Sequence, residues 1–302
     1  MWPRHAAFWP IGSAREASIA PDLSPGLGAP TASPGSALRW EDHPRASDPA
    51  GDVRFGIDRR EFLPFYQPVV ALPTGELLGF ECLARWRHPW LGLLGPERFI
   101  SIAEDSKDIG DLSYTLLEQA SRDAAVWPAH LRFSINISPV QLQDPDLPLH
   151  LLRLLHEGAI APGRLTVEIT ESRPVADMAM ARHVLTSLRA AGIQVVLDDF
   201  GSGSASLLSL HQLPLDGLKV DRSFLVALDS ASGRMIIRAI IDLADGLGMT
   251  TLIEGVESRE QAEQLQALGF ERAQGFLFGR PMPAAAAARM IAQGVLRRRW
   301  GR

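Results

Sequence analysis

The sequence predicts an α/β protein built as a (β/α)8 barrel of the TIM type, and two observations support this prediction. Short apolar, β-prone runs alternate with amphipathic helical patterns from about residue 62 onward, which is typical of parallel βα units. Eight such strands fall within about 240 residues, close to the usual length of this barrel. An open doubly wound sheet is the alternative, but the glycine-rich phosphate-binding turn that follows its first strand is missing.

The first 55 residues are interpreted as a disordered or low-complexity leader, and residues 56–302 as the barrel. The leader is rich in Pro, Gly, Ala and Ser and has no sustained hydrophobic period, so it lacks the apolar residues that a core requires. The barrel begins with two β-prone runs, Phe62–Leu72 and Leu77–Trp86, which are separated by a turn at Pro73–Gly75. This tight link predicts a hairpin, with the first strand antiparallel to the others.

The remaining elements follow in regular order. Further strands are expected at residues 132–137, 165–170, 194–198, 217–221, 250–254 and 272–276. Helices are expected near residues 96–105, 111–126, 148–157, 176–190, 204–211, 233–247, 258–268 and 283–296. Glycines such as Gly192, Gly248 and Gly269 stand where helices of this pattern should end, as is common at helix C-termini.

Composition narrows the class of protein. The 302 residues are 46% hydrophobic and 22% charged, as in ordinary globular proteins, and the net charge of −5 gives no basic field for a nucleic-acid polymer. Cys82 is the single cysteine, which fits a reducing compartment. No apolar run reaches the roughly 18 residues of a membrane span, and the N-terminus lacks a secretory signal. We therefore expect a cytoplasmic protein.

A candidate site lies at the ends of the strands. In the stretch Gln194–Ser204 a buried strand runs into the adjacent carboxylates Asp198 and Asp199 and then into a glycine-rich turn. Two neighbouring acids are costly unless a cation lies between them. Polar residues end most of the other strands too, and side chains alternate along a strand. The residues expected to point into the barrel mouth are Glu81, Asn136, Glu168, Asp198, Lys219, Glu254 and Gln274.

These residue types indicate a metal centre. A barrel interior is normally filled with branched apolar residues, so polar side chains at seven strand ends require a reason. One lysine does not neutralise the converging carboxylates, whereas divalent cations would. Oxygen ligands without His or Cys favour Mg²⁺ or Mn²⁺ over zinc. Two metals that share one carboxylate are the usual arrangement for in-line hydrolysis of a phosphoester.

Two basic residues complete this hypothesis. Lys219 either orients the attacking water or simply lines the barrel in a pair with Asp221. Arg85 shares a strand face with Glu81 and Leu83, and its guanidinium suits a substrate phosphate.

The motifs at these strand ends resemble those of the EAL domain, in the same order and over roughly residues 60–298. They are Tyr66-Gln-Pro-Val-Val70, Glu81-Cys-Leu-Ala-Arg85, Ser134-Ile-Asn-Ile-Ser138, Glu168-Ile-Thr-Glu171, Asp198-Asp-Phe-Gly-Ser-Gly203, Leu218-Lys-Val-Asp221, Glu254-Gly-Val-Glu257 and Gln274-Gly-Phe276. The resemblance implies a bacterial phosphodiesterase specific for cyclic di-GMP. Such enzymes use Mg²⁺ or Mn²⁺ on a (β/α)8 barrel to open one phosphodiester and give linear pGpG.

The resemblance also implies a role for each matching residue. The implied ligands of one metal are Glu81, Asn136, Glu168 and Asp198, and those of the second are Asp198, Asp199 and Glu254. The implied catalytic set is Lys219, Glu81, Asp198 and Gln274, with Lys219 at the nucleophilic water. The implied substrate contacts are Arg85, Leu83 and Gln67. Glu171 would anchor the loop after Asp199, and Asp221 and Glu257 would support the ligands from behind.

Two departures from the EAL pattern bear on the expectations. Cys82 replaces the usual Ala, but alternation turns it toward the helices. Ser204 stands where the family commonly has Tyr, which bears on the loop and on the coupling between subunits of the expected homodimer. Calcium is expected to inhibit, because a larger and more loosely coordinated ion misplaces the bridging hydroxide.

Two alternative functions remain open. One is a catalytically inactive barrel that binds cyclic di-GMP or a partner protein, although no metal ligand has been lost. The other is an interaction module whose basic end, Arg297–Arg299 with Arg302, touches nucleic acid or anionic lipid. Arginines at the end of a helix are more often there because they complement its macrodipole.

Overall fold

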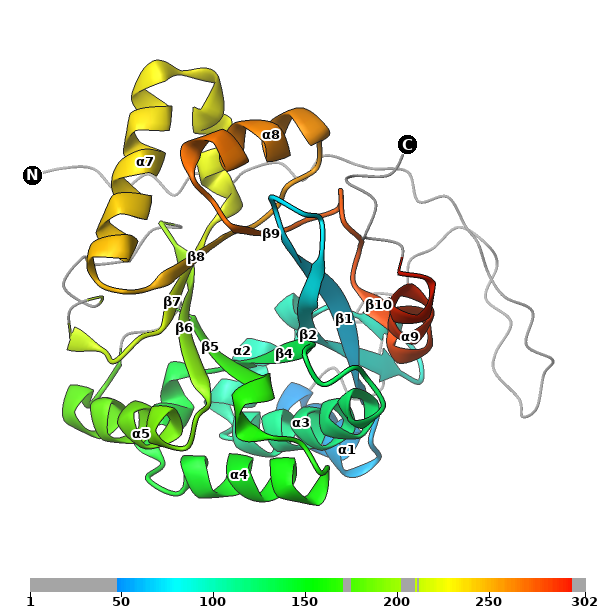
Figure 1. Cartoon of the computed structure of the whole chain (residues 1–302). Helices are drawn as coiled ribbons and strands as arrows, with labels where there is room; N and C mark the ends of the chain where they lie inside the picture. The colour runs from blue at the N-terminus through cyan, green and yellow to red at the C-terminus, as the bar shows by residue number, and fades with distance from the viewer. Residues whose placement is uncertain (1–47, 171–174, 202–209, 211, 295–302) are drawn as a thin grey trace, which may run out of the picture. The chain divides into compact units, whose positions relative to one another are not determined.

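The computed structural model describes residues 48–170, 175–201, 210 and 212–294. Within them, eight strands close into a barrel in the order β1-β2-β4-β5-β6-β7-β8-β9, with β9 pairing back onto β1 (Figure 1). These strands are β1 (Phe62–Ala71), β2 (Leu77–His88), β4 (Arg132–Ile137), β5 (Leu165–Thr170), β6 (Gln194–Phe200), β7 (Gly217–Val220), β8 (Thr250–Ile253) and β9 (Arg272–Gln274). The predicted barrel is confirmed.

The first strand runs against its neighbours, as the hairpin predicts. Strand β1 is antiparallel to both β2 and β9, whereas the pairs from β2–β4 through β8–β9 are parallel. Two short strands that the sequence did not indicate extend the sheet: β3 (Gly92–Leu94) pairs with β2, and β10 (Met282–Pro283) pairs with β1.

Helices surround the barrel (Figure 1). They are α1 (Pro49–Asp58), α2 (Ile100–Asp105), α3 (Ile109–Ala125), α4 (Leu147–Glu157), α5 (Met178–Ala190), α7 (Ala231–Gly246), α8 (Arg259–Leu268) and α9 (Ala284–Gln293). Short 3-10 helices are η2 (Pro96–Arg98), η3 (Pro139–Gln143), η4 (Pro162–Arg164) and η5 (Arg222–Asp229). The helix expected near 96–105 is thus split into η2 and α2, and most of the one expected at 204–211 lies outside the described residues.

Local sequence explains where a helix such as α8 begins and ends. The Ser258 side chain accepts a hydrogen bond from the Gln261 backbone, and the Gln261 side chain accepts one from the Ser258 backbone. This capping box satisfies amide groups that the first turn leaves without partners. At the other end Gly269 adopts the left-handed conformation, with φ of +107°, which glycine enters without steric cost.

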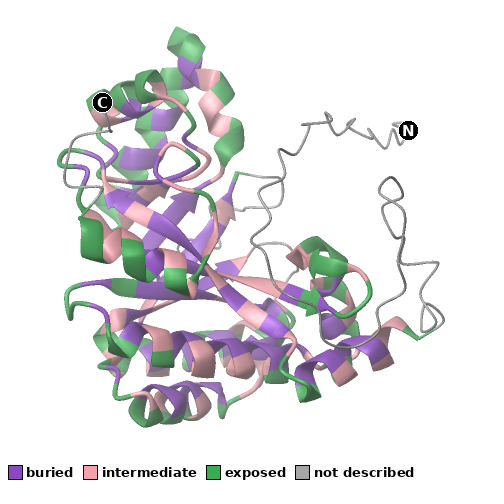
Figure 2. Ribbon diagram, turned by 90° about the vertical axis from the view of Figure 1, so that its right-hand side faces the viewer, coloured by how far each residue is buried: buried purple, intermediate pink, exposed green. Residues whose placement is uncertain are grey.

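The main core lies between the outer face of the barrel and its helices, where Figure 2 shows buried residues. Outward-facing residues of the strands, such as Phe133, Ile135 and Val167, belong to this cluster. The inward-facing positions between them hold Ser134, Asn136 and other polar residues. The apolar faces therefore pack on the helices and leave the polar faces to the barrel interior, as alternation predicts.

A second core includes helix α1 and corrects the expected leader boundary. Val53 and Ile57, one turn apart on α1, are buried against Trp86 and Phe99. Asp48 caps this helix by accepting a hydrogen bond from the Gly51 backbone. The folded unit therefore begins by residue 48 rather than at 56, because two apolar residues in a short helix are enough to bury one face.

No helix in the described ranges has both the length and the apolar composition to cross a membrane.

Candidate functional site

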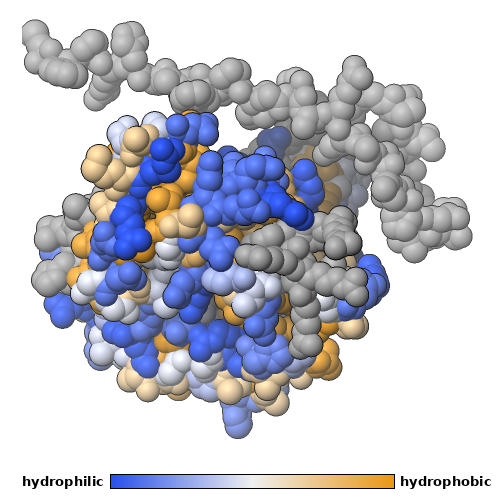
Figure 3. Space-filling model, turned by 45° about the horizontal axis from the view of Figure 1, so that its top comes forward, coloured by the Kyte–Doolittle hydropathy of each residue, from blue (hydrophilic) through white to orange (hydrophobic). Residues whose placement is uncertain are grey.

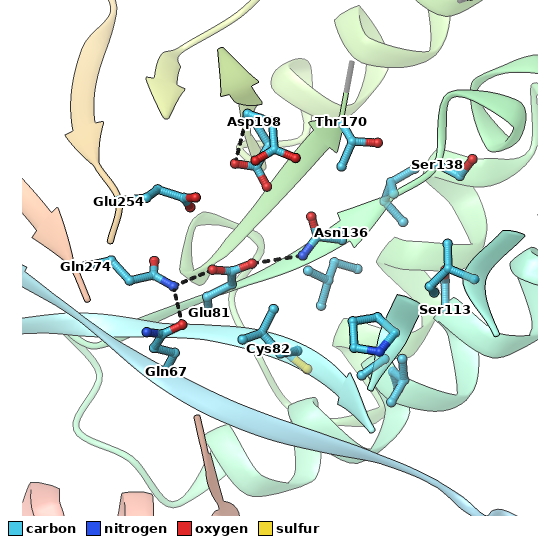
Figure 4. A pocket seen from close by; sticks show the side chains of 18 of the residues that line it. Gln67, Glu81, Cys82, Ser113, Asn136, Ser138, Thr170, Asp198, Glu254 and Gln274 are labelled. Carbon is cyan, nitrogen blue, oxygen red and sulfur yellow. Dashed lines mark hydrogen bonds between the residues drawn. The ribbon is translucent and has the colours of Figure 1, made fainter. Parts of the chain in front are cut away.

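The seven polar residues expected at the strand ends come together at the carboxyl-terminal mouth of the barrel. A pocket of about 440 Å³ opens there, and its walls include Glu81, Asn136, Asp198, Glu254 and Gln274. Figure 4 shows these side chains, from separate strands, pointing toward one another. The two remaining residues, Lys219 and Glu168, lie beneath this group.

Lys219 holds the acidic residues together. Its ammonium is 1% exposed and lies 2.9 Å from Glu168 Oε2 and 3.0 Å from Asp198 Oδ1. It also lies 2.7 Å from Glu254 Oε1 and 3.3 Å from Glu81 Oε2. Strands β2, β5 and β6 contribute Glu81, Glu168 and Asp198, and Glu254 directly follows β8. One cation therefore faces four anions, and most of the negative charge is left without a partner.

Amide side chains fix the orientation of Glu81. Asn136 Nδ2 donates to Glu81 Oε1 at 3.0 Å, and Gln274 Nε2 donates to Glu81 Oε2 at 2.5 Å (Figure 4). Gln274 Nε2 also donates to Gln67 Oε1 at 3.0 Å. In the part of the chain that the structure describes, Gln274 Oε1 is buried and accepts no hydrogen bond. A buried acceptor of this kind is costly unless a donor or a cation fills the site.

Asp199 reaches the site through a distortion of strand β6. Strict alternation would turn it away from Asp198, but the pairing of β6 with β7 slips by one residue between Leu197 and Phe200. Asp199 adopts a left-handed φ of +57° at this point, a conformation that Asp tolerates better than most residues. Its backbone N–H donates to Asp198 Oδ1 at 2.9 Å. The bulge therefore brings two adjacent carboxylates to the same mouth.

The carboxylates share the single ammonium of Lys219, and most of their pKa values are raised. Burial and neighbouring anions raise the pKa of Glu168 well above its ordinary range, although Lys219 opposes the shift. Burial likewise raises the pKa of Asp198 to about 6 and that of Glu254 to about 8, and it raises the pKa of Asp199.

Glu81 and Lys219 keep their charges. Burial alone would raise the pKa of Glu81, but Lys219 and the amides of Gln274 and Asn136 leave it below its ordinary value. Burial alone would lower the pKa of Lys219, but Asp198 and the other carboxylates raise it well above its ordinary value.

Two overlapping groups of carboxylates are arranged so that each could hold a metal ion. Carboxylate oxygens of Glu81, Glu168 and Asp198 lie within 4.8 Å of one another, and so do those of Asp198, Asp199 and Glu254. Asp198 belongs to both groups. The donors are oxygens, and the Gln274 carbonyl oxygen lacks a partner among the described residues. Such a set suits ions that prefer oxygen ligands.

Comparison with known proteins shows the family of the chain. A profile of the EAL domain matches residues 50–281. The chain belongs to the EAL-domain family. Among its curated relatives, the cyclic di-GMP phosphodiesterase RocR of Pseudomonas aeruginosa is 37% identical over 254 residues, which cover 81% of this chain and 65% of RocR. The probable cyclic di-GMP phosphodiesterase PdeN of Escherichia coli is 35% identical, over 78% of this chain and 46% of PdeN.

Solved EAL structures share the fold. The PaMucR phosphodiesterase in complex with c-di-GMP has a TM-score of 0.73 and 35% identity, and covers 79% of this chain and 99% of that chain. The calcium/cy-diGMP complex of Klebsiella pneumoniae BlrP1 has a TM-score of 0.65 and 30% identity, over 74% of this chain and 56% of that chain. The chain spans only 29% to 36% of the length of three further curated relatives.

Other residues expected at the EAL site lie in different surroundings. Leu83 and Gln67 line the pocket, but Arg85 lies outside the described residues that line it. The Arg85 guanidinium donates to the Ala84 carbonyl at 2.7 Å and lies 5.9 Å from the Phe65 ring centroid. Cys82 is buried in the main core, as alternation predicts, although it also borders the pocket.

The residues expected to support the ligands from behind are more peripheral. Asp221 caps η5 by accepting a hydrogen bond from the Ser223 backbone at 2.9 Å. Glu257 is exposed at the pocket rim. Glu171, Ser204 and the basic residues from 297 onward lie outside the described residues.

The sequence analysis did not identify several residues that line the pocket. Arg222 is an exposed cation at the rim, Phe276 is an aromatic residue that is 46% exposed, and Glu104 is a buried carboxylate whose Oε1 accepts from Ser138 Oγ at 2.6 Å. The composition also singles out Lys219, a signal that the sequence analysis did not use. The chain has 30 Lys and Arg residues, and only two of them, Lys107 and Lys219, are lysines. A lysine at a buried strand position of such an arginine-rich chain indicates a specific need for a compact ammonium.

Proposed function

We propose that this EAL domain hydrolyses cyclic di-GMP to linear pGpG with two Mg²⁺ or Mn²⁺ ions, and so lowers the level of this second messenger. The observation that supports it best is the pair of carboxylate groups that share Asp198. The relatives named as cyclic di-GMP phosphodiesterases support the same substrate and reaction. Every expected metal ligand is present, which favours an active enzyme over a receptor that only binds the nucleotide.

The proposed ligands divide into two sets around Asp198. Glu81, Asn136, Glu168 and Asp198 would hold one ion, and Asp198, Asp199 and Glu254 would hold the other. When bound, such ions lower the pKa of a water molecule and offset the charge that develops on the phosphate. With such ions bound, the carboxylates would no longer share a single ammonium, and Lys219 would be free to orient the attacking water and to stabilise charge on the phosphate oxygens. Gln274 holds Glu81 and presents its carbonyl oxygen to the same space.

The shape of the pocket suits a nucleotide. One side is apolar, with walls that include Ile100, Ile109 and Leu112, and the buried carboxylate Glu104 also faces it. Such a lobe would cover the flat face of a purine base and accept hydrogen bonds from its edge. The exposed ring of Phe276 offers a stacking surface for the other base, and Leu83 and Gln67 line the same pocket. We propose Arg222 as the cation nearest the substrate phosphates, and Arg85 as a contact that requires its side chain to move.

We further propose that the domain acts in the cytoplasm as a homodimer that pairs through helix α7. Met235 and Ile236 on this helix are 69% and 54% exposed, and Leu243 and Leu247 continue the apolar stripe. Figure 3 shows hydrophobic surface among hydrophilic residues at the upper left, the side on which Figure 1 shows α7. Sedimentation of Ile236→Glu should then give a monomer, with Arg238→Glu on the opposite face of the helix as the control.

A product assay tests the proposed activity. Purified protein with Mg²⁺ should convert cyclic di-GMP to pGpG, separated by ion-pair chromatography, and EDTA should stop the reaction until Mg²⁺ is restored. Saturable binding of cyclic di-GMP without any pGpG in Mg²⁺ or Mn²⁺ would identify a receptor instead. Retention on DNA or on a partner protein, with neither binding nor turnover of the nucleotide, would identify an interaction module.

A further inference from the structure

The barrel has a second cavity at the end opposite the acidic site. Arg132, Gln194, Thr250 and Arg272 are the first residues of the parallel strands β4, β6, β8 and β9, so they lie together at the amino-terminal end. They line a cavity of about 250 Å³ that reaches inward to Glu168 and Lys219. Small and medium side chains such as Ser134, Thr166 and Val196 form its walls. Barrels of this kind usually pack bulky branched residues here, so the axis is left partly open.

The rim of this cavity is cationic. Arg132 and Arg272 both line it, with His130 beside them. Among the described residues, neither guanidinium has a carboxylate oxygen within the 4.0 Å of an ion pair. Arg132 instead donates to the uncharged side-chain oxygen of Gln194. Both guanidinium groups thus border the same cavity. The pKa of Arg272 is lowered by burial and then by the positive charge of Arg132, whereas the carboxylate of Glu271 opposes this shift.

We infer that the amino-terminal end of the barrel binds a small oxyanion, the phosphate or carboxylate group of a compact metabolite, between Arg132 and Arg272. A guanidinium presents two parallel N–H donors that match a phosphate or carboxylate, and it does so more specifically than an ammonium. An anion between the two arginines would replace their repulsion by two attractive contacts. Ser134, which is buried, and Thr250 add hydroxyl groups to the same walls.

The size and position of the cavity distinguish this ligand from the proposed substrate. The cavity has little more than half the volume of the pocket at the acidic mouth, about 250 Å³ against 440 Å³. Its inner wall is formed by Lys219 and Glu168, whose charged atoms are 2.9 Å apart. A bound anion would therefore lie behind this ion pair, which separates it from the other proposed metal ligands. The inference does not depend on the proposed hydrolysis.

Calorimetric titration with inorganic phosphate tests the site. The full-length protein, with Mg²⁺ present and in a low-chloride buffer, should bind one phosphate per chain at the arginine site. Arg272→Gln and Arg132→Gln should each weaken this binding at least about tenfold, because each removes a charged hydrogen-bonding partner. Arg153→Gln is the matched control, since Arg153 is an exposed arginine of α4 that pairs with Glu157, and it should bind as the wild type does.

Two further measurements complete the test. Arg272→Lys keeps the charge but loses the paired donors, so it should show a smaller loss than Arg272→Gln. Titration with malonate in place of phosphate tests whether the same arginines bind a carboxylate ligand. Thermal melting verifies that each variant folds. The inference is overturned if neither probe binds saturably to the wild type. It is equally overturned if Arg272→Gln binds as tightly as Arg153→Gln, because phosphate held at the metal site would survive both substitutions.

Discussion

The two ends of the barrel are formed by the same strands but present opposite charges. Strand β9 places Arg272 at the amino-terminal end and Gln274, two residues later, at the mouth, and β4 likewise has Arg132 at the amino-terminal end and Asn136 at the mouth. Side chains two positions apart on one face are separated by only about 7 Å along a strand. A change of residue type within one strand is therefore enough to separate an acidic centre from a basic cavity.

The comparison shows that a polar barrel interior can be stabilised in two ways. At the mouth, four carboxylates gather around the ammonium of Lys219, so the charge is dense, buried and only partly balanced. At the other end, two arginines border a cavity, and Arg132 has the uncharged Gln194 as its hydrogen-bond partner. The first arrangement suits additional cations, and the second suits an anion. Four experiments test whether the mouth behaves as this contrast requires.

The largest effect should come from removing a metal ligand at the mouth. Glu81→Ala should reduce hydrolysis of cyclic di-GMP to below about 1% of wild type, because it removes several kcal/mol of charge stabilisation by the ions. Its melting temperature should fall little, since a buried negative charge is lost with the side chain. Glu76→Ala, an exposed glutamate in the β1–β2 turn, is the control. Full pGpG production by Glu81→Ala would refute the assignment of this ligand.

The next effect concerns the ammonium that joins the carboxylates. Lys219→Met should reduce turnover at least about a hundredfold and lower the free energy of unfolding in EDTA by about 3–5 kcal/mol, because a buried ionic cluster loses its cation. Mg²⁺ should restore more stability to this variant than to the wild type. Lys107→Met removes the other, exposed lysine and should leave urea unfolding unchanged. Equal unfolding curves for both variants in EDTA would contradict this role of Lys219.

Calcium in place of magnesium should give a smaller loss. We expect less than about a tenth of the Mg²⁺-supported rate, because Ca²⁺ accepts longer and more variable ligand distances. Nucleotide binding should persist, and the calcium/cy-diGMP complex of BlrP1 is a precedent in a similar protein. Parallel measurements of pGpG formation and of cyclic di-GMP binding separate the two effects. Equal turnover with both ions would count against a site that requires a fixed geometry.

The smallest effect is on the pH dependence of melting without metals. The folded chain raises the pKa of Asp198 to about 6 and that of Glu254 to about 8. Stability linked to these raised pKa values is fully present below the unfolded values near 4 and is lost as the pH rises through 6 and 8. In EDTA the wild type should therefore lose more stability between pH 5 and pH 8 than Glu254→Gln does. Calorimetry of both proteins across this range would reveal it, and parallel pH profiles would argue against the shift.

Much of the fold could be predicted because its signals are local. Apolar runs of strand length, helical periodicity and the glycines after helices determine the order of elements, and alternation within each strand placed Glu81, Glu168 and Lys219 on the inward face. The same local rule failed for Asp199, which reaches the mouth through a bulge in β6. It also missed α1, because Val53 and Ile57 are too few to produce a periodic pattern.

The sequence by itself determined that a barrel would form and that acids and amides would end its strands, since both follow from the order and spacing of residues along the chain. The tertiary structure alone decided which of them meet. Lys219 contacts four carboxylates at the ends of four strands, Arg85 donates to the neighbouring Ala84 carbonyl, and Arg132 and Arg272 line one cavity although 140 positions separate them in the sequence. These contacts depend on strand register and on the closure of β9 onto β1. Both bring together residues that are far apart in the sequence, and the sequence separation of two residues does not predict whether they meet in the fold.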